Sequence, residues 1–290
     1  MILLDAIAQH LAQLTAIRLP LRQSHAIAGG CINRAMKISD GNQSWFVKIN
    51  QAGLLPMFEA EADALKEMES GGIRVPKPVC HGTADDLCYL VQEYLELNGR
   101  MDSVALGGQL AGMHQCTAQQ FGWHRNNTIG ATPQINTVNA DWLAFWRQHR
   151  LGFQLQLAAN KGFDGAIQEL GTELLQALPM FFAGYRPQAS LLHGDLWGGN
   201  AAALADGTPV IFDPALYYGD RETDIAMTSL FGGFDERFYA AYNDVWPLDA
   251  GYKHRKTLYN LYHVLNHLNL FGGGYQQQAL TMMRQLLALI

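Results

Sequence analysis

Short runs of alternating or continuous apolar residues in the first third of the chain predict a set of β-strands. The runs cover residues 24–28, 32–38, 43–49 and 87–94. Alternation places successive side chains on opposite faces of a sheet. The Asp40-Gly41 pair between the second and third runs is typical of a tight hairpin. Prolines at 76 and 78 restrict residues 74–79 to an extended segment at a sheet edge.

Helical spacing of apolar residues occurs twice in this region and then dominates the chain. An amphipathic helix is expected within residues 1–19, and a second one over residues 56–69, where Ser70-Gly71-Gly72 follows as a stop signal. After residue 95, helical patterns prevail almost to the end. We therefore expect two domains, residues 1–95 and residues 96–290, in an α+β fold.

Composition narrows the classes of protein that fit this pattern. Of the 290 residues, 49% are hydrophobic and 16% are charged, and the formal net charge is −6. These values exclude a disordered chain, and the absence of a basic run argues against nucleic-acid binding. No apolar stretch approaches the roughly 18–20 residues that span a bilayer. The four cysteines show no C-x-x-C spacing, so we expect reduced thiols and a cytoplasmic location. No membrane partner is expected, and the protein is expected to be a monomer or a homodimer.

The strongest chemical signal lies in the second half of the chain. An apolar strand leads into His193-Gly194-Asp195, and Asn200 follows five positions after the Asp. Residues 201–212, with Asp206-Gly207 in the middle, then predict a β-hairpin that ends on Asp213. A hairpin brings Asn200 and Asp213 to the same open end, where their oxygens suit Mg²⁺. Asp195 is left to accept a proton from a hydroxyl, as in phosphotransferases with a protein-kinase fold.

That interpretation requires a lysine on a strand and a glutamate on a helix. Alternation over Trp45–Ile49 places Lys48 on the face opposite Trp45, Val47 and Ile49. On the 56–69 helix, Glu61 falls within the apolar stripe, whereas Glu59 lies about a quarter-turn away. Because an unpaired buried charge is costly, Lys48 is the expected partner of Glu61. The alternative is a glutamate at the edge of the stripe that reaches solvent.

A turn and a hinge complete the candidate nucleotide site. Gly29 and Gly30 lie between the first two predicted strands and would let backbone N–H groups approach phosphates. The P-loop sequence G-x-x-x-x-G-K-[ST] is absent from the chain. Adenine is expected to bind the hinge formed by Gln92, Glu93, Tyr94 and Leu95. Cys31, beside the glycines, is either a redox-sensitive thiol or an inert turn residue.

With these residues in place, the chain resembles one family throughout nearly its whole length: the fructosamine/ketosamine 3-kinases, which are relatives of the aminoglycoside phosphotransferases. The resemblance rests on residues 29–32, 46–50, 57–62, 127–134, 150–152, 193–200, 212–215 and 230–234. The Trp197-Gly198-Gly199 insert distinguishes this family from other phosphotransferases.

The resemblance implies a bilobal, protein-kinase-like fold with a β-rich N-terminal lobe and a larger helical C-terminal lobe. It also implies ATP and Mg²⁺ as cofactors and phosphorylation of a ketosamine on its 3-hydroxyl, with the substrate either free or protein-bound. The phosphorylated product in that family breaks down and frees the amine, so the expected role is deglycation.

The sugar site is less determined by the sequence. Trp197 follows the candidate base, and an indole packs well on the C–H face of a sugar. Asn127 and Gln134 are further candidates for substrate contact. Trp142 and Trp146 are expected in the core. His193 and Asp224 are expected to support the catalytic loop.

Two other functions remain open on the residues alone. One is a kinase of another small hydroxylated metabolite, such as an aminoglycoside or choline. The other is a nucleotide-binding pseudokinase, although the full set of Lys48, Glu61, Asp195, Asn200 and Asp213 argues against it. A protein-kinase role is disfavoured because no A-P-E sequence occurs.

Overall fold

The computed structural model describes residues 3–14, 21, 23–27, 32–232 and 234–290. The chain divides into two compact units. The first contains Met1–Asp102 and Ala202–Asp213, and the second contains Ser103–Ala201 and Pro214–Ile290. This division falls after the expected boundary at residue 95, and it assigns the 202–213 segment to the first unit.

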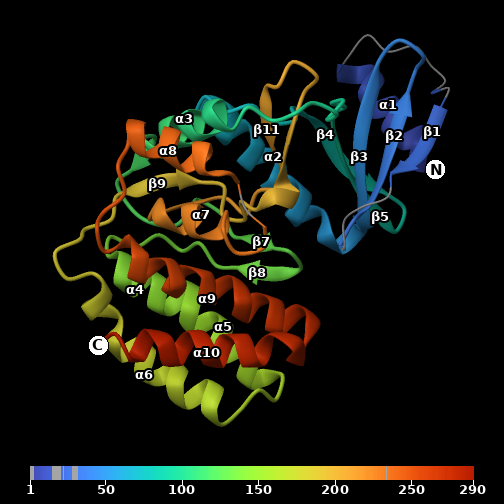
Figure 1. Ribbon diagram of the computed structural model, residues 1–290. Helices are drawn as coiled ribbons and strands as arrows, with labels where there is room; N and C mark the ends of the chain where they lie inside the picture. The colour runs from blue at the N-terminus through green and yellow to red at the C-terminus, as the bar shows by residue number, and fades with distance from the viewer. Residues whose placement is uncertain (1–2, 15–20, 22, 28–31, 233) are drawn as a thin grey trace. The chain divides into compact units, whose positions relative to one another are not determined.

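The first unit is built on an antiparallel five-stranded sheet in the order β1-β2-β3-β5-β4 (Figure 1). Its strands are β1 (Gln23–Ile27), β2 (Arg34–Ser39), β3 (Ser44–Gln51), β4 (Pro78–Ala84) and β5 (Leu87–Glu93). The predicted hairpin joins β2 to β3, with Ser39 opposite Ser44 and Gly41 at a φ of 96°. The predicted edge segment is confirmed in β4, although the strand begins at Pro78 and continues to Ala84.

Two helices cover opposite faces of this sheet. Helix α1 (Leu3–Leu14) packs with the Trp45, Val47 and Ile49 side of β3. The short 3₁₀ helix η1 (Ala52–Leu54) leads into α2 (Leu55–Ser70), which packs on the other side, against Leu90 of β5. The alternation read from the sequence is therefore correct, and it leaves Lys48 on the α2 side. The hairpin of β10 (Ala201–Ala203) and β11 (Pro209–Ile211) is also present as predicted.

The second unit is mainly helical and contains short strands, of which the sequence predicted the one that leads into His193. Strands β6 (Thr117–Ala118), β9 (Ala189–Leu192) and β12 (Tyr217–Gly219) form one antiparallel sheet, and β7 (Asn127–Ile129) pairs with β8 (Thr132–Gln134). The helical elements before β9 are α3 (Ser103–His114), α4 (Trp142–Trp146), η2 (Arg147–Leu151), α5 (Gly152–Asn160) and α6 (Ala166–Phe181). After β9 come η3 (Gly198–Asn200), α7 (Glu222–Met227), α8 (Glu236–Val245), α9 (Tyr252–Phe271), η4 (Gly273–Tyr275) and α10 (Gln276–Leu287).

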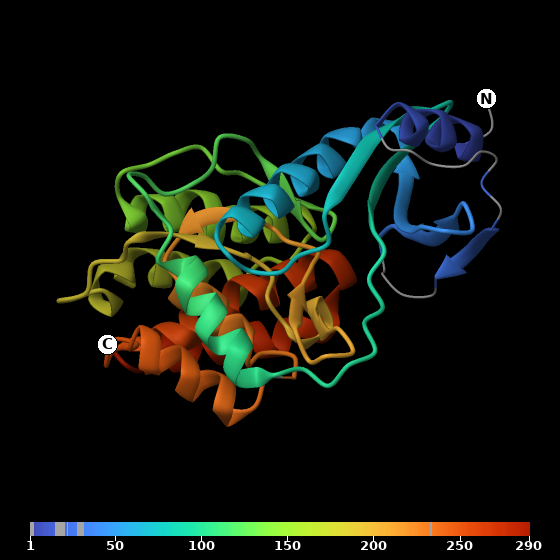
Figure 2. The same ribbon diagram turned by 90° about the horizontal axis from the view of Figure 1, so that it is seen from above.

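Helix α9 lies at the centre of this unit. It packs against α7, α5 and α10, while α3 and α8 lie side by side, as both views show (Figures 1 and 2). Trp142 and Trp146 are buried beside Tyr259 of α9, so their predicted place in the core is confirmed. Among the described residues, no helix has both the length and the apolar character needed to cross a membrane.

A buried ion pair fixes α9 to α7. Arg255 donates to both carboxylate oxygens of Glu222, at 2.7 and 3.0 Å, and also donates to Phe181 O at 3.1 Å. Arg255 is 2% exposed and Glu222 is fully buried. Arg255 also donates to Asp249 Oδ1 at 2.6 Å. Removal of one partner of the buried pair is costly, because the charge that remains is desolvated with less compensation.

We expect Glu222→Gln to lower the free energy of unfolding by about 3 kcal/mol, because it leaves the Arg255 guanidinium buried with the half-exposed Asp249 carboxylate as its remaining counter-charge. Lys77→Ala is the matched control. It breaks the exposed Lys77–Glu69 pair and should cost under about 1 kcal/mol. Urea unfolding followed by tryptophan fluorescence measures both, and equal losses would show that burial of the pair does not matter.

Candidate active site

In the first unit, a buried lysine is held between two carboxylates. Lys48 on β3 is 6% exposed, and its Nζ donates to Glu61 Oε1 of α2 at 2.5 Å and to Asp213 Oδ1 after β11. Burial disfavours the ammonium form, but the charges of Asp213 and Glu61 outweigh it and raise the pKa of Lys48. Lys48 therefore stays protonated, and the predicted Lys48–Glu61 pair is present.

The side chain of Gln92 completes this cluster. Its Nε2 donates to Glu61 Oε1 at 2.8 Å, and the residue is 3% exposed at the end of β5. The sequence suggested a hinge here, with Glu93, Tyr94 and Leu95. In the structure, Glu93 pairs with Arg74 at 2.7 Å. Tyr94 and Leu95 follow the end of β5. The support that Gln92 gives to Glu61 was not foreseen, because it depends on the β5–α2 packing.

Asp213 adopts a backbone conformation that is uncommon for residues other than glycine. Its φ is 58°, in the left-handed region, directly before Pro214. Non-glycine residues seldom adopt this region, and those that do are often found at functional sites. Its side chain is 48% exposed, although one oxygen accepts from Lys48. Asp213 is thus the one member of the cluster with a carboxylate that solvent or a ligand can reach.

In the second unit, β9 ends on the predicted loop of His193, Gly194 and Asp195. Gly194 has a φ of 84°, and a Cβ there would lie 2.0 Å from Ala215 O. Only glycine fits this position, because the next strand connection passes directly against it. The fully buried His193 accepts the Asp195 N–H on its Nδ1 at 3.2 Å, and its own carbonyl accepts from Ala215 N at 2.9 Å.

The carboxylate of Asp224 holds this loop from inside the unit. It accepts the backbone N–H groups of His193 at 2.7 Å and Gly194 at 2.8 Å, and His114 Nε2 lies 3.1 Å from it. His114 in turn contacts the hydroxyl of Tyr242 at 2.8 Å. Burial by itself would raise the pKa of Asp224, but the hydrogen bond and charge of His114 lower it below its ordinary value. The expected bracing contacts of His193 and Asp224 are therefore present, and His114 is an addition to them.

Asn200 and Trp197 follow in the same loop. Asn200 is 7% exposed, and its Nδ2 donates to Asp195 O at 2.8 Å, which ties it to the candidate base. In the described part of the chain, no hydrogen bond uses its Oδ1. Trp197 is 36% exposed, and a Cβ on Gly199 would lie 2.3 Å from its indole. The ring folds over Gly199, which explains why the insert needs a glycine at that position.

Asn127 and Gln134, the two amide candidates for sugar contact, form hydrogen bonds within the protein. Gln134 is 1% exposed and donates to both Asn127 Oδ1 and Ala215 O at 2.9 Å, while its Oε1 accepts from Tyr262. Asn127 Nδ2 donates to Leu216 O at 2.8 Å. These bonds fix the chain just after Asp213. The geometry gives Asn127 and Gln134 a positioning role and leaves Trp197 as the exposed candidate for sugar contact.

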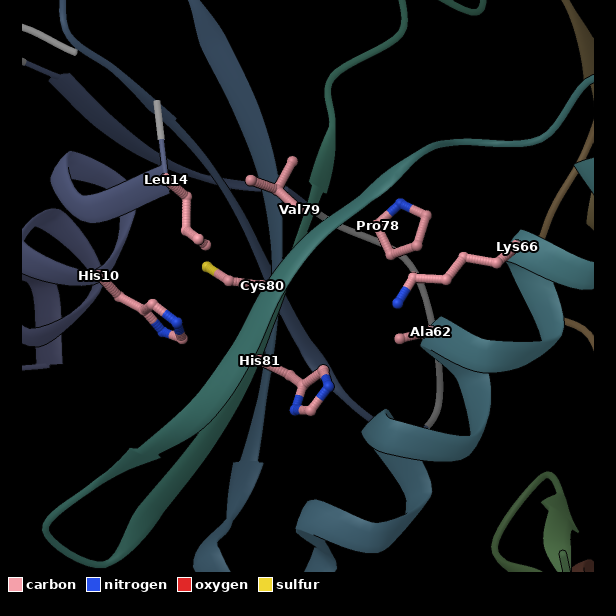
Figure 3. A pocket seen from close by; sticks show the side chains of 8 residues that line it. All are labelled: His10, Leu14, Ala62, Lys66, Pro78, Val79, Cys80 and His81. Carbon is pink, nitrogen blue, oxygen red and sulfur yellow. The ribbon is translucent and has the colours of Figure 1, made fainter. Parts of the chain in front are cut away.

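Gly29, Gly30 and Cys31 fall outside the described residues. A cavity of about 220 Å³ in the first unit, between α1, β4 and α2, is lined by His10, Lys66 and His81 among others and by no predicted site residue (Figure 3).

Within the described ranges, no cluster of three or more His, Cys, Asp or Glu side chains suits a metal. A magnesium ion fits that finding, because it commonly uses one or two protein oxygens together with substrate phosphates.

The comparison with known sequences decides the family. The sequence profile described as Fructosamine kinase matches residues 3–289. The chain belongs to the fructosamine kinase family. This confirms the resemblance and the prediction of a phosphotransferase that acts on an alcohol group.

Individual relatives agree with this assignment. A Synechocystis protein named as a probable ketoamine kinase is 47% identical over 290 residues, covering 98% of this chain and 96% of its own. The chloroplastic protein-ribulosamine 3-kinase of Arabidopsis thaliana is 43% identical over 270 residues, covering 91% and 82%. The crystal structure of a Haemophilus somnus protein that carries the name fructosamine-3-kinase matches with a TM-score of 0.89 and 31% identity, covering 97% of this chain and 96% of that one.

More distant structures share the fold alone. Spectinomycin phosphotransferase, solved with ADP and spectinomycin, matches with a TM-score of 0.56 at 12% identity, covering 97% of this chain and 93% of that one. The likeness confirms the kinase-like α+β fold. Two buried contacts in the site of this chain were not predicted from the sequence. One is His114, which contacts Asp224 110 positions later in the chain. The other is the side chain of Gln92, which donates to Glu61.

We expect Asp224→Asn to destabilise the protein by about 3 kcal/mol near neutral pH, because one amide cannot accept all the donors that face the carboxylate. The folded-state pKa of Asp224 is depressed, so its stabilisation is complete above the unfolded-state pKa and is lost as pH falls through the folded-state value. The difference between wild type and variant should be constant above about pH 5 and shrink below about pH 4.

Urea unfolding at a series of pH values measures this difference. Asp235→Asn, which alters an exposed helix cap, is the control and should show a smaller loss. A gap between wild type and Asp224→Asn that widens on acidification would contradict the assignment.

Proposed function

We propose that this chain is an ATP-dependent ketosamine 3-kinase that phosphorylates the 3-hydroxyl of fructosamine- or ribulosamine-type substrates. The observation that carries the proposal is the buried Lys48 shared by Glu61 and Asp213, in a chain of this family. A buried ammonium with one accessible carboxylate beside it suits a nucleotide phosphate and its metal ion. The names of the relatives support the choice of a ketosamine as the acceptor.

Each residue has a distinct part in the proposed reaction. Lys48, kept in place by Glu61, contacts the phosphates of ATP, and residues 92–95 bind the adenine. Asn200 and Asp213 would hold Mg²⁺, which would offset negative charge on the phosphate oxygens. Asp195 orients the sugar hydroxyl and accepts its proton. Trp197 packs against the sugar ring.

Support for Asp195 as the base comes from its surroundings in the second unit. The N–H groups of His193 and Gly194 are taken up by Asp224, and Asn200 is bonded to the Asp195 carbonyl. The loop is therefore held from behind, and the Asp195 side chain remains partly exposed. A positioned carboxylate of this kind is suited to general base catalysis.

The physiological consequence follows from the product chemistry of the family. A ketosamine phosphorylated on its 3-hydroxyl breaks down and frees the amine, so we propose a role in deglycation. A cytoplasmic location remains a prediction from the sequence.

The experiment that tests this function is ATP turnover with a ribulosamine and a fructosamine, followed by NMR assignment of the phosphorylated hydroxyl. We expect transfer to the 3-hydroxyl. Asp195→Asn should lower kcat by about 100-fold or more without weakening nucleotide binding, because it removes only the proton acceptor.

Aminoglycosides and choline are the comparison substrates. Transfer to one of these but to neither ketosamine would contradict the proposal and favour a kinase of another metabolite. ATP binding without transfer to any acceptor would favour a pseudokinase. Unchanged turnover in Asp195→Asn would remove Asp195 from the mechanism.

A further inference from the structure

A continuous row of aromatic side chains leads away from the candidate catalytic loop along the surface of the second unit. We call it the aromatic row; it consists of Trp197, Phe231, His267, Phe271 and Tyr275. Successive ring centroids lie 6.5 Å apart from Trp197 to Phe231, 4.5 Å from Phe231 to His267 and 5.5 Å from His267 to Phe271. Each separation lies within the range of a direct ring contact.

The local structure explains how these rings come together. His267 and Phe271 stand one turn apart on α9, so they share a face of the helix. Gly272, at a φ of 92°, ends α9 and lets η4 turn back, which places Tyr275 5.2 Å from His267 and 6.4 Å from Phe271. The row is therefore supported by regular helical structure over most of its length.

The near end of the row is connected to the reaction centre of the second unit. Trp197 follows Asp195 by two residues, and its indole lies over Gly199. The loop that carries Phe231 passes close behind, since a Cβ on Gly198 would lie 3.2 Å from Gly232 O. The aromatic row therefore begins in the loop that carries Asp195.

The row is more exposed than a hydrophobic core requires. Trp197 is 36% exposed and Phe271 is 58% exposed, while Phe231, His267 and Tyr275 are partly exposed. Contiguous apolar groups at a protein surface commonly mark a binding site. Trp197 and Phe271 are the exposed members of the row, so a ligand can reach them.

The charge of the surroundings favours a cationic, alkyl-bearing occupant. The last turn of α9 carries no basic side chain, so the negative end of its helix dipole is not offset there. Burial lowers the pKa of His267, which leaves the imidazole neutral at pH 7. Aromatic faces attract ammonium groups and pack against methylene chains. A ketosamine carries such a group, because its sugar is joined to a protonatable secondary amine.

We propose that the aromatic row binds the amine-bearing part of the ketosamine, and that its occupant is the side chain of a glycated lysine in a polypeptide. The inference rests on the proposed function, because it takes Asp195 as the site of the sugar hydroxyl. Trp197 covers the sugar, Phe231 and His267 contact the amine and the lysine methylenes, and Phe271 and Tyr275 contact the polypeptide beyond them.

The test compares two ribulosamines that differ only in the amine. One is a short peptide with a single ribulosyl-lysine, and the other is the ribulosamine of methylamine, which is too short to reach Phe271. In Phe271→Ala and Tyr275→Ala, the ratio of the peptide KM to the methylamine-derivative KM should rise about three- to tenfold above wild type. Free ribulosyl-lysine should show an intermediate change, because it has the methylenes without the flanking chain.

Met180→Ala is the matched control, since Met180 is 56% exposed in the same unit and lies outside the row. Its KM ratio should equal that of wild type. An unchanged KM ratio in both row variants would overturn the inference. Loss of a dimer in Phe271→Ala, with its KM ratio unchanged, would overturn it as well. If wild type phosphorylates neither ribulosamine, the proposed function itself fails, which is a different result from an unchanged ratio.

Discussion

The shared ion pair of Lys48 is the interaction on which the first unit and its proposed chemistry depend. A buried ammonium is tolerated only when carboxylates surround it, and here they come from α2 and from the end of the β10–β11 hairpin. Asp213 lies 165 positions after Lys48 in the chain, yet the requirement for a counter-charge joins them. The proposed function rests on the same need for charge balance. In that proposal a nucleotide phosphate would take the place of Asp213 beside Lys48, and a metal ion would take the place of Lys48 beside Asp213.

In the second unit, the loop that carries Asp195 is held in place by a different carboxylate, that of Asp224. Asp224 is buried and ionised because two backbone N–H groups and His114 face it. Its bonds go to the residues just before Asp195, so the loop is fixed while the Asp195 side chain remains accessible. Gly194 and Gly199 serve the same end by making room, the first for the Ala215 carbonyl and the second for the Trp197 indole. The two glycines of this loop therefore have a steric explanation, and Asp224 has an electrostatic one.

Features that depend on neighbouring residues could be predicted from the sequence. The β2–β3 hairpin, the face of β3 that carries Lys48, and the place of Glu61 on the α2 stripe all follow from local periodicity and turn chemistry. The strand before His193 and the hairpin after Asn200 were predicted for the same reason. The pairing of Lys48 with Glu61 could be inferred because a buried carboxylate requires a cation.

Features set by distant contacts could not be predicted in this way. The role of His114 depends on Asp224, and the bonds of Gln134 depend on Ala215 and Tyr262. Such amides look like candidate ligand contacts until their protein partners are known. The assignment of residues 202–213 to the first unit has the same origin, since Ile211 N bonds to Arg74 O and Gly99 N bonds to Ala203 O. No local pattern encodes these pairings.

Calorimetric titration of ATP, with and without Mg²⁺, into wild type and Asp213→Asn tests whether Asp213 changes its partner when the nucleotide binds. If Asp213 exchanges Lys48 for the metal ion, the variant leaves Lys48 with one counter-charge fewer. It should bind Mg²⁺-free ATP several-fold more tightly than wild type, by about 1 kcal/mol, and should gain little from Mg²⁺. If both proteins bind Mg²⁺-free ATP with equal affinity, and Mg²⁺ raises that affinity equally in both, then Asp213 does not exchange Lys48 for the metal ion.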